Sequence, residues 1–523
     1  MKTLEEEIEI IPPDTVRSFA KINSCGLIGV NAYPVEIEVD ISGGLPNFIL
    51  VGLPDAAINE SRERVRSAIK SSGLEFPPKK IVVNLAPADT KKAGPTYDLP
   101  IAIGILATLE HLNKNNLENL FIVGELGLSG KVRQVNGVLS FVLLAKNKNA
   151  KGIIVPKENA SEASLINGIN IYPTSTLNET INIINNLDQI KPQERIEEKE
   201  INRNVKIDFC DVKGQSLAKR ALEVAASGGH HVLMIGAPGS GKSMLAQRLT
   251  TILPALSYEE RIEITQIYSA AGKLTSETKL IRNRPFRAPH HSASTSGLIG
   301  GGSIPQPGEI SLAHKGILFL DELTEFQKQV LDSLRQAIEA KEITISRSRR
   351  SCTFPCDFTF VAACNPCACG YLGDSLKKCI CNSNIIRKYQ GKISGPIIDR
   401  IDLQIEVKRL TENELITTKT EEKSEKVLER VLKTRGIQKK RYKDLDILSN
   451  SHLTSKEIKQ FCKLESKAQL VLKEAIRRFA LTARSYDRIL KVSRTIADLG
   501  NSDIIKDEHI LEALQFRLNA AKV

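Results

Sequence analysis

Residues 231–243, "HVLMIGAPGSGKS", place a short apolar run directly before a glycine-rich segment that matches G-x-x-x-x-G-K-[ST] at every fixed position. The following residues, "SMLAQRLTTIL", have helical character. Glycines permit positive φ, so successive backbone N–H groups can face phosphate oxygens beside a helix N-terminus. The stretch predicts an α/β domain with a phosphate loop. We expect Lys242 to reach the β- and γ-phosphates of ATP and Ser243 to ligate Mg²⁺, in a loop formed by Gly236, Ala237, Pro238, Gly239, Ser240, Gly241, Lys242 and Ser243.

Two later apolar runs end in polar residues suited to nucleotide chemistry. "GILFLDE" ends in Asp321 and Glu322, and "FTFVAAC" runs into Asn365. With a phosphate loop upstream, Asp321 would hold the Mg²⁺ shell and Glu322 would act as general base on a water. Asn365 would touch the γ-phosphate or that water. Taken alone, an acidic pair at the end of a strand is usually a solvated turn.

Two arginines are candidates for stabilising the transition state of phosphoryl transfer. Arg400 lies in "SGPIIDRIDL", where it serves either as an arginine finger or as a salt-bridge partner of Asp399 or Asp402. Arg484, in "LTARSYDRIL", is the second candidate. If both act on ATP, one must come from a neighbouring subunit, which requires a ring or a filament.

Composition indicates a soluble globular protein. The chain has 523 residues, of which 41% are hydrophobic and 26% are charged, and no apolar run approaches the ~20 residues that span a bilayer. Its acidic N-terminus lacks the apolar core of a signal peptide, so we expect a cytoplasmic protein with reduced cysteines and no membrane partner. The net charge of +12 favours either a polyanionic partner or a lysine-rich solvated surface.

The pattern of apolar runs divides the chain into five segments. After an extension at 1–17, strand-like and helical runs alternate over 18–187, and a charged linker follows at 188–206. A second α/β pattern covers 207–408. Residues 409–523 read as a helical lid domain, with amphipathic segments at 413–442, 465–481, 483–499 and 506–518.

Five of the ten cysteines fall within residues 363–382. Cys367, Cys369, Cys379 and Cys381 form two C-x-C pairs, and four thiolates can close a tetrahedral Zn²⁺ site. The alternatives are reduced cysteines without metal, or recruitment of Cys352 and Cys356. Redox catalysis is opposed by the lack of a nearby histidine or nucleophile pattern. Bound zinc would be structural, because four thiolates leave no open position, and would stiffen the segment between Asn365 and Arg400.

The sequence resembles the Mg-chelatase-like ComM/YifB family of AAA+ ATPases, of the helix-2-insert type, over nearly the whole chain. The resemblance rests on "DVKGQSLAKRALEVAASGGHHVLMIGAPGSGKSMLA", "RPFRAPHHSAS", "LIGGGSIPQPGEISLAHKGILFLDEL", "AACNPCACGYLGD" and "ISGPIIDRIDL". It implies a Walker A motif at Gly236–Ser243, a Walker B motif at Asp321 and Glu322, sensor 1 at Asn365, a trans arginine finger at Arg400 and sensor 2 at Arg484. It also implies a hexameric ring that acts as a DNA helicase, driving branch migration when transforming DNA is integrated.

Two basic segments are candidates for DNA contact. The insert before Walker B, residues 284–310, carries Arg284 and Arg287, and in related rings such inserts project into the central channel. "EITISRSRRSCTFP" predicts a β-hairpin with Arg347, Arg349 and Arg350 at its tip, where three guanidiniums favour phosphate. A mobile surface loop and a solvated turn are the alternatives. Neither segment has an aromatic platform for base stacking.

Residues 20–185 resemble the proteolytic domain of the Lon protease family, an α+β domain of S5 fold 2-type. Thr96, in "AGPTYDLPIAIGILATL", stands at the place of that family's nucleophilic serine, and Leu139 stands at the place of its lysine. A nucleophile needs an adjacent base, and leucine cannot act as one. We therefore expect this fold without peptidase chemistry.

Together these features predict a hexameric ATP-dependent DNA translocase or helicase that acts on single-stranded, forked or branched DNA in natural transformation and homologous recombination. The main rival is a magnesium-chelatase-type motor subunit that uses ATP to drive metal insertion. An ATP-dependent protease is a third hypothesis, which the missing catalytic lysine opposes.

Overall fold

The computed structural model describes residues 18–194, 207–275, 280–302, 305–347, 350–393, 395–411, 414, 421–445, 447–479 and 481–518. The predicted extension at 1–17 and the linker from 195 to 206 lie outside these residues. The chain divides into two compact units. The N-terminal unit comprises Met1–Lys199, Thr265–Ile281 and Ile304–Gln306, and the C-terminal unit comprises Glu200–Ile264, Arg282–Ser303 and Pro307–Val523.

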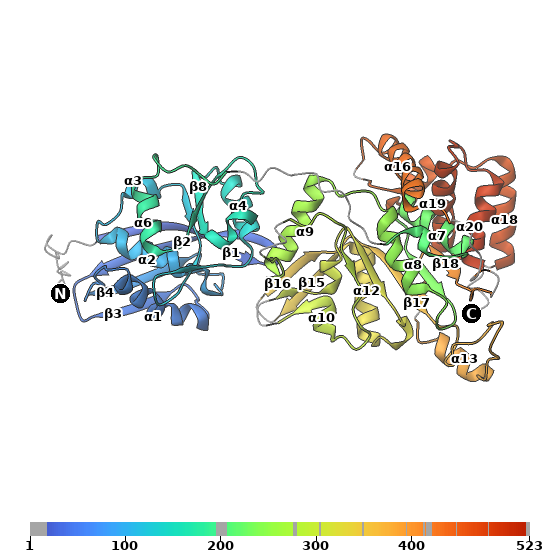
Figure 1. Cartoon of the computed structure of the whole chain (residues 1–523), viewed down its shortest axis with the longest axis horizontal. Helices are drawn as coiled ribbons and strands as arrows, with labels where there is room; N and C mark the ends of the chain where they lie inside the picture. Colours follow the sequence, from blue (N-terminus) through green and yellow to red (C-terminus); the bar gives the residue numbers. More distant parts are fainter. Residues whose placement is uncertain are drawn as a thin grey trace, which may run out of the picture. The chain divides into compact units, whose positions relative to one another are not determined.

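A mixed sheet of seven strands forms the N-terminal unit (Figure 1). Its longest pair is antiparallel and runs in register from Ser18↔Ile41 to Ile28↔Asn31. Alternate residues of the second strand, from Val35 to Ile41, are buried, as expected for a strand with one face on a core. The sheet order is β3 (Asn47–Val51), β4 (Lys80–Ala86), β2 (Asn31–Ser42), β1 (Ser18–Ile28), β5 (Leu120–Ile122), β8 (Gly152–Pro156) and β9 (Asn170–Thr174).

Helices complete the core of this unit. Every residue of α2 (Asp98–Thr108) is buried, which agrees with a sequence that is apolar on all sides. The amphipathic α1 buries one face, including Val65 and Ile69. The bounds of the other long helices are Ala56–Ser71 for α1, Val138–Asn147 for α4 and Leu177–Asn185 for α6.

A five-stranded sheet organises the C-terminal unit, and all of its strand pairs are parallel. Its order is β11 (Phe286–Arg287), β14 (Ile317–Leu320), β17 (Thr359–Cys364), β10 (Val232–Ile235) and β18 (Leu403–Glu406). Ile235 pairs with Cys364 and Leu320 pairs with Ala362, so the three central strands end at one edge. That edge therefore carries the residues that follow each strand: Gly236, Asp321 and Asn365.

The C-terminal helices share one buried cluster with this sheet, as Val232, Ile405, Val431 and Ile496 illustrate. Figure 1 draws these helices in orange and red, near α7. The four predicted amphipathic segments become helices, although the first starts only at Ser424, and its residues 415–420 lie outside the described part. The bounds are Ser216–Gly228 for α7, Ser424–Arg441 for α16, Ser455–Phe461 for α17, Ser466–Phe479 for α18, Ala483–Leu499 for α19 and Asp507–Leu518 for α20.

Among the described residues, no helix combines the length and the apolar character that crossing a membrane requires.

A buried polar network fixes α19 against its neighbours. The Asp498 side chain is 0% exposed, and its Oδ1 lies 3.1 Å from Nε of Arg494, which is equally buried. Its Oδ2 accepts hydrogen bonds from Arg441 Nη1 and Asn450 Nδ2, each at 2.9 Å. Because three elements meet at one carboxylate, its removal would leave two guanidiniums without their counter-charge.

We expect Asp498→Ala to destabilise the C-terminal unit by about 3–5 kcal/mol, because breaking a buried ion pair leaves an uncompensated charge. Urea unfolding followed by circular dichroism measures the shift. Glu508→Ala is the matched control, since that side chain is 68% exposed and its contacts with Lys506 and His509 are long, at 3.9 and 3.6 Å. Equal midpoints for the two variants would contradict the role given to Asp498.

Candidate functional site

The phosphate loop joins β10 to α8 (Lys242–Arg248) and depends on its glycines. Gly239 and Gly241 have φ of 77° and 93°, and the space beside each is open. A Cβ on Gly236 would lie 2.2 Å from the carbonyl oxygen of Val407, so only glycine fits there. The loop therefore presents backbone rather than side chains to its open side, as a phosphate cradle requires.

Lys242 and Ser240 fit a phosphate ligand. The Lys242 ammonium donates to the carbonyl oxygens of Gly236 and Ala237, at 2.7 and 3.0 Å. Burial lowers the pKa of this ammonium, and the Asp321 carboxylate opposes that shift. The buried Ser240 hydroxyl has no hydrogen-bond partner among the described residues. Both side chains thus hold hydrogen-bonding capacity that anionic oxygens would use.

The acidic pair after β14 lies beside the loop. Ser243 Oγ donates to Asp321 Oδ2 at 2.6 Å, so the two predicted Mg²⁺ ligands are already adjacent. Glu322 is exposed and has φ of 51°, a left-handed conformation that is costly for a residue with a side chain. Such strain concentrates at functional sites. The Glu322 Oε2 atom lies 3.3 Å from Nδ1 of His291, a residue of the insert.

Asn365 completes the group at the edge of the sheet. Its Oδ1 lies 3.4 Å from the Lys242 ammonium nitrogen. The structure thus brings together Lys242, Ser243, Asp321 and Asn365, with Glu322 directly after Asp321. This set offers a cation, an amide and two carboxylates around one cradle, which suits binding and hydrolysis of a nucleoside triphosphate.

Arg400 lies away from this group. Its guanidinium donates to the carbonyl oxygen of Pro396 and pairs with Glu339, and its side chain is 7% exposed. The alternative role of Arg400, a salt bridge with Asp399 or Asp402, is corrected by the structure: the described ion pair of Arg400 is with Glu339, and Asp402 pairs with Arg488 at 3.1 Å. Arg400 lines a cavity of about 860 Å³ together with Glu339, Asp402 and Arg488. Its Nε atom has no hydrogen-bond partner among the described residues.

Arg484 is exposed in the first turn of α19. The role of Arg484 as sensor 2 stays a prediction. The role of Arg400 as an arginine finger for a neighbouring subunit also stays a prediction.

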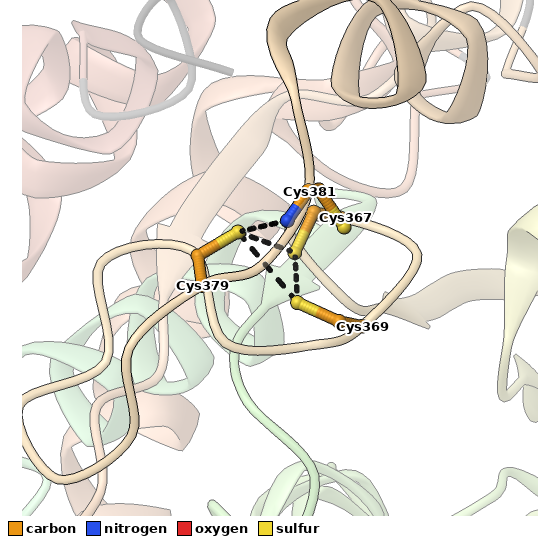
Figure 2. Close-up of side chains that lie close together, drawn as sticks. All are labelled: Cys367, Cys369, Cys379 and Cys381. Atoms are coloured by element: carbon orange, nitrogen blue, oxygen red, sulfur yellow. Dashed lines mark hydrogen bonds between the residues drawn. The ribbon is translucent and has the colours of Figure 1, made fainter.

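Four cysteines converge after Asn365, as Figure 2 shows. We call residues 367–381 the cysteine knuckle. Sulfur–sulfur distances are 3.4 Å for Cys367–Cys369, 3.7 Å for Cys367–Cys379 and 3.6 Å for Cys369–Cys379. All four sulfurs lie within 4.8 Å of one another. Tetrahedral zinc with Zn–S bonds of ~2.3 Å requires sulfurs about 3.8 Å apart, so the cluster is compatible with structural zinc.

The remaining cysteines lie elsewhere. Cys352 is on β16 (Arg350–Pro355), and the thiol of Cys356 lies 3.7 Å from the carbonyl oxygen of Ala337, so neither belongs to the described cluster. Burial raises the pKa of Cys364 to about 12, as expected for an unreactive thiol in a core strand.

The candidate DNA-contacting arginines differ in their surroundings. Arg287 forms a bidentate ion pair with Glu309, with N–O distances of 2.5 and 2.7 Å. Arg284 donates to the carbonyl oxygens of Pro254 and Lys315. DNA contact by either would require it to exchange these partners. The predicted hairpin is confirmed: β15 (Glu342–Arg347) pairs with β16 (Arg350–Pro355), and Arg347 lies opposite Arg350. Arg349 and the side chains of Arg347 and Arg350 lie outside the described part.

In the N-terminal unit, Leu139 is fully buried in α4 and its backbone N–H donates to Glu162 at 3.0 Å. Thr96 lies in a short 3-10 turn at Pro95–Tyr97. Leu139 is therefore a core residue of this unit, and the absence of peptidase chemistry stays a prediction.

Three partners were missed from the sequence: His291 beside Glu322, Glu339 beside Arg400, which lies away from the phosphate loop, and Arg409 beside that loop, where its Nη2 donates to Pro238 at 3.0 Å. The histidine pair in the insert was a visible signal for the first. Glu339 and Arg409 stand in ordinary charged stretches, so only the fold shows that Glu339 pairs with Arg400 and that Arg409 contacts the phosphate loop.

Comparisons with known proteins identify the family of the chain. Three family profiles match: magnesium chelatase, subunit ChlI, over residues 208–415; subunit ChlI of Mg-chelatase over 37–159; and its C-terminal part over 421–517. The Magnesium-chelatase 67 kDa subunit of Chlorobaculum parvum is 30% identical over 164 residues, which are 31% of this chain and 23% of that protein.

Two relatives match over almost their full length. YifB of Escherichia coli K12 and the competence protein ComM of Haemophilus influenzae are each 44% identical over 504 residues, which cover 96% of this chain and 97% of theirs. The phosphate loop, the acidic pair and the cysteine knuckle thus sit in a chain similar to these relatives from end to end. The chain belongs to the ComM/YifB family of Mg-chelatase-like ATPases.

Proposed function

We propose that the protein is an ATP-driven DNA translocase that works as a hexamer and promotes branch migration when transforming DNA is integrated by homologous recombination. The observation that carries the proposal is the convergence of Lys242, Ser243, Asp321 and Asn365 at one edge of a parallel sheet. The match to a relative named as a competence protein supports the DNA role.

Each residue at the edge has a defined task in hydrolysis. Backbone N–H groups of the loop and the Lys242 ammonium bind the β- and γ-phosphates. Glu322 takes a proton from the attacking water, and Asn365 orients that water or the γ-phosphate. Ser243 and Asp321 would hold Mg²⁺, which when bound neutralises charge on the phosphates.

The arginine that completes the site comes from a neighbouring subunit. Arg400 already pairs with Glu339, whose side chain is 56% exposed, so a partner from outside can reach this pair. A γ-phosphate is a stronger anionic partner for a guanidinium than an exposed carboxylate. Assembly of the hexamer would therefore exchange Glu339 for the neighbour's ATP, while Arg484 acts within its own subunit.

We assign DNA contact primarily to the hairpin formed by β15 and β16. In the sequence Arg349 stands between Arg347 and Arg350, which pair at the end of the hairpin, and the hairpin starts immediately after α12 (Lys328–Ala340), the helix that carries Glu339. In contrast, Arg284 and Arg287 are engaged within the chain. A movement of α12 would therefore be passed both to the hairpin and to Arg400, which pairs with Glu339 on this helix.

Magnesium chelation is the second candidate function, because the matching profiles belong to a magnesium-chelatase subunit. The basic hairpin and the end-to-end similarity to ComM favour the DNA role. An N-terminal unit of Lon-protease type without peptidase chemistry would serve assembly or partner binding. A casein digest tests the protease hypothesis directly.

We also propose that the cysteine knuckle binds one structural Zn²⁺. The fit of the three sulfur–sulfur distances to a tetrahedral site supports this assignment.

Glu322→Gln is expected to bind ATP with unchanged affinity but to lower kcat by about 10²–10⁴-fold, because the general base is lost. Lys242→Ala is expected to lose nucleotide binding itself. Steady-state ATPase assays and equilibrium binding separate the two effects. Glu325→Gln, three residues away and paired with Lys392, serves as control and keeps wild-type turnover. A Glu322→Gln protein with full turnover would refute this site.

Forked or Holliday-type DNA is expected to stimulate ATP hydrolysis, and ATP is expected to drive strand separation or branch migration. The triple variant Arg347→Ala, Arg349→Ala and Arg350→Ala should lose the stimulation while it keeps its DNA-free turnover, because the hairpin contacts phosphates. Gel assays of DNA products and coupled ATPase assays measure both. Unstimulated hydrolysis with unchanged DNA would favour the chelatase function.

Purified protein is expected to carry one zinc per chain by elemental analysis. Cys369→Ser and Cys379→Ser should each lower the zinc content at least tenfold, because thiolate ligands are lost. Cys210→Ser, at a half-buried cysteine outside the cluster, is the matched control. Equal zinc in all three variants would show that the knuckle does not hold the metal.

A further inference from the structure

Arg409 joins the cysteine knuckle to the phosphate loop. Its Nη2 donates to the carbonyl oxygen of Pro238 at 3.0 Å, and its Nε lies 3.2 Å from Oδ2 of Asp374. The guanidinium carbon also lies 5.6 Å from the centre of the Tyr371 ring. One side chain therefore touches the nucleotide cradle at one end and two knuckle residues at the other.

The knuckle end of this bridge is rigid. The Asp374 side chain is 1% exposed, and its Oδ1 accepts from the backbone N–H groups of Leu376 and Lys377 at 2.8 and 2.9 Å. Its other oxygen is thereby aimed at Arg409. A guanidinium held by a fixed carboxylate and an aromatic face loses little further freedom when it binds the loop.

A second contact reaches the same loop residue. Gly370, inside the knuckle, has φ of 85°, and a Cβ there would lie 2.7 Å from Cδ of Pro238. The knuckle backbone therefore packs directly on the proline whose carbonyl Arg409 binds. Two independent contacts from the knuckle converge on Pro238.

The contact with Arg409 matters because it can fix the orientation of the peptide bond between Pro238 and Gly239. A trans peptide is planar, so its carbonyl oxygen and its N–H point in opposite directions. Glycine at 239 makes a flip of that peptide cheap, since it tolerates positive and negative φ. Arg409 holds the carbonyl on the knuckle side and thereby keeps the Gly239 N–H on the opposite side, where the loop cradles phosphate.

We propose that the metal-bound knuckle orients the phosphate loop through Arg409, so that zinc occupancy sets the affinity for nucleotide. Arg409 is a positioning residue in this scheme, because it acts through Pro238 and Gly239. The inference rests on the proposed ATP and zinc sites and adds the link between them.

The test compares Arg409→Ala with Lys377→Ala in the full chain. Both cations lie over the Tyr371 ring: Lys377 Nζ is 5.0 Å and Arg409 Cζ is 5.6 Å from the ring centre. Of the two residues, Arg409 is the one that the structure describes in contact with the phosphate loop. Binding of a fluorescent non-hydrolysable ATP analogue and zinc content are measured. Arg409→Ala should bind about tenfold more weakly, which is ~1.4 kcal/mol, with zinc and kcat unchanged. Arg409→Lys should recover part of the loss, and Lys377→Ala should match wild type.

Zinc removal by a chelator supplies the second measurement. It should weaken analogue binding by wild type about tenfold but add little to Arg409→Ala, because both changes act through one link. Equal analogue affinity of wild type and Arg409→Ala would overturn the positioning role alone. Additive losses on zinc removal would also overturn it. A wild-type protein that binds no analogue would overturn the proposed function together with this inference.

Discussion

Parallel pairing of three strands is the constraint on which the rest of the C-terminal unit depends. The register Ile235↔Cys364 and Leu320↔Ala362 makes β10, β17 and β14 end together. Each strand is buried, so a shift of register would expose apolar side chains to water. The same energy that holds the core therefore holds Lys242, Asp321 and Asn365 within reach of one another.

Glycines convert this edge into a cradle, and the surroundings limit their freedom. Gly236 is fixed by the close carbonyl of Val407, whereas Gly239 and Gly241 have open space and positive φ. Loops of this kind need support from outside to keep a single conformation. The knuckle provides this support at Pro238, directly before Gly239, the first of the two glycines with open space beside them. The phosphate loop and the cysteine knuckle thus meet at Pro238.

Local pattern predicted the central strands and the long C-terminal helices of the C-terminal unit, and the residues that meet at its phosphate loop. The phosphate loop, the acidic pair and Asn365 were each visible because they follow short apolar runs. The long antiparallel pair β1–β2 was not identified, although Val35, Ile37, Val39 and Ile41 alternate as a half-buried strand should. Helix α17 was missed because it has only seven residues.

Partner choice for charged side chains was beyond sequence reasoning. Arg400 pairs with Glu339, 61 residues away, rather than with its near neighbours. Asp402 is occupied by Arg488, and Arg287 by Glu309. Charged residues are common in every segment, so spacing alone cannot select a partner, whereas cysteines are few and their clustering predicted the knuckle correctly.

The most direct test of a site shared between subunits mixes two inactive variants. If the site is shared, Arg400→Ala keeps its own phosphate loop but does not serve a neighbour, and Lys242→Ala binds no nucleotide but keeps its arginine. Mixed in equal amounts, the two are expected to regain a substantial fraction of wild-type ATP hydrolysis, because some interfaces pair an intact loop with an intact arginine. A mixture as inactive as its components, under conditions in which wild type turns over, would contradict catalysis at subunit boundaries.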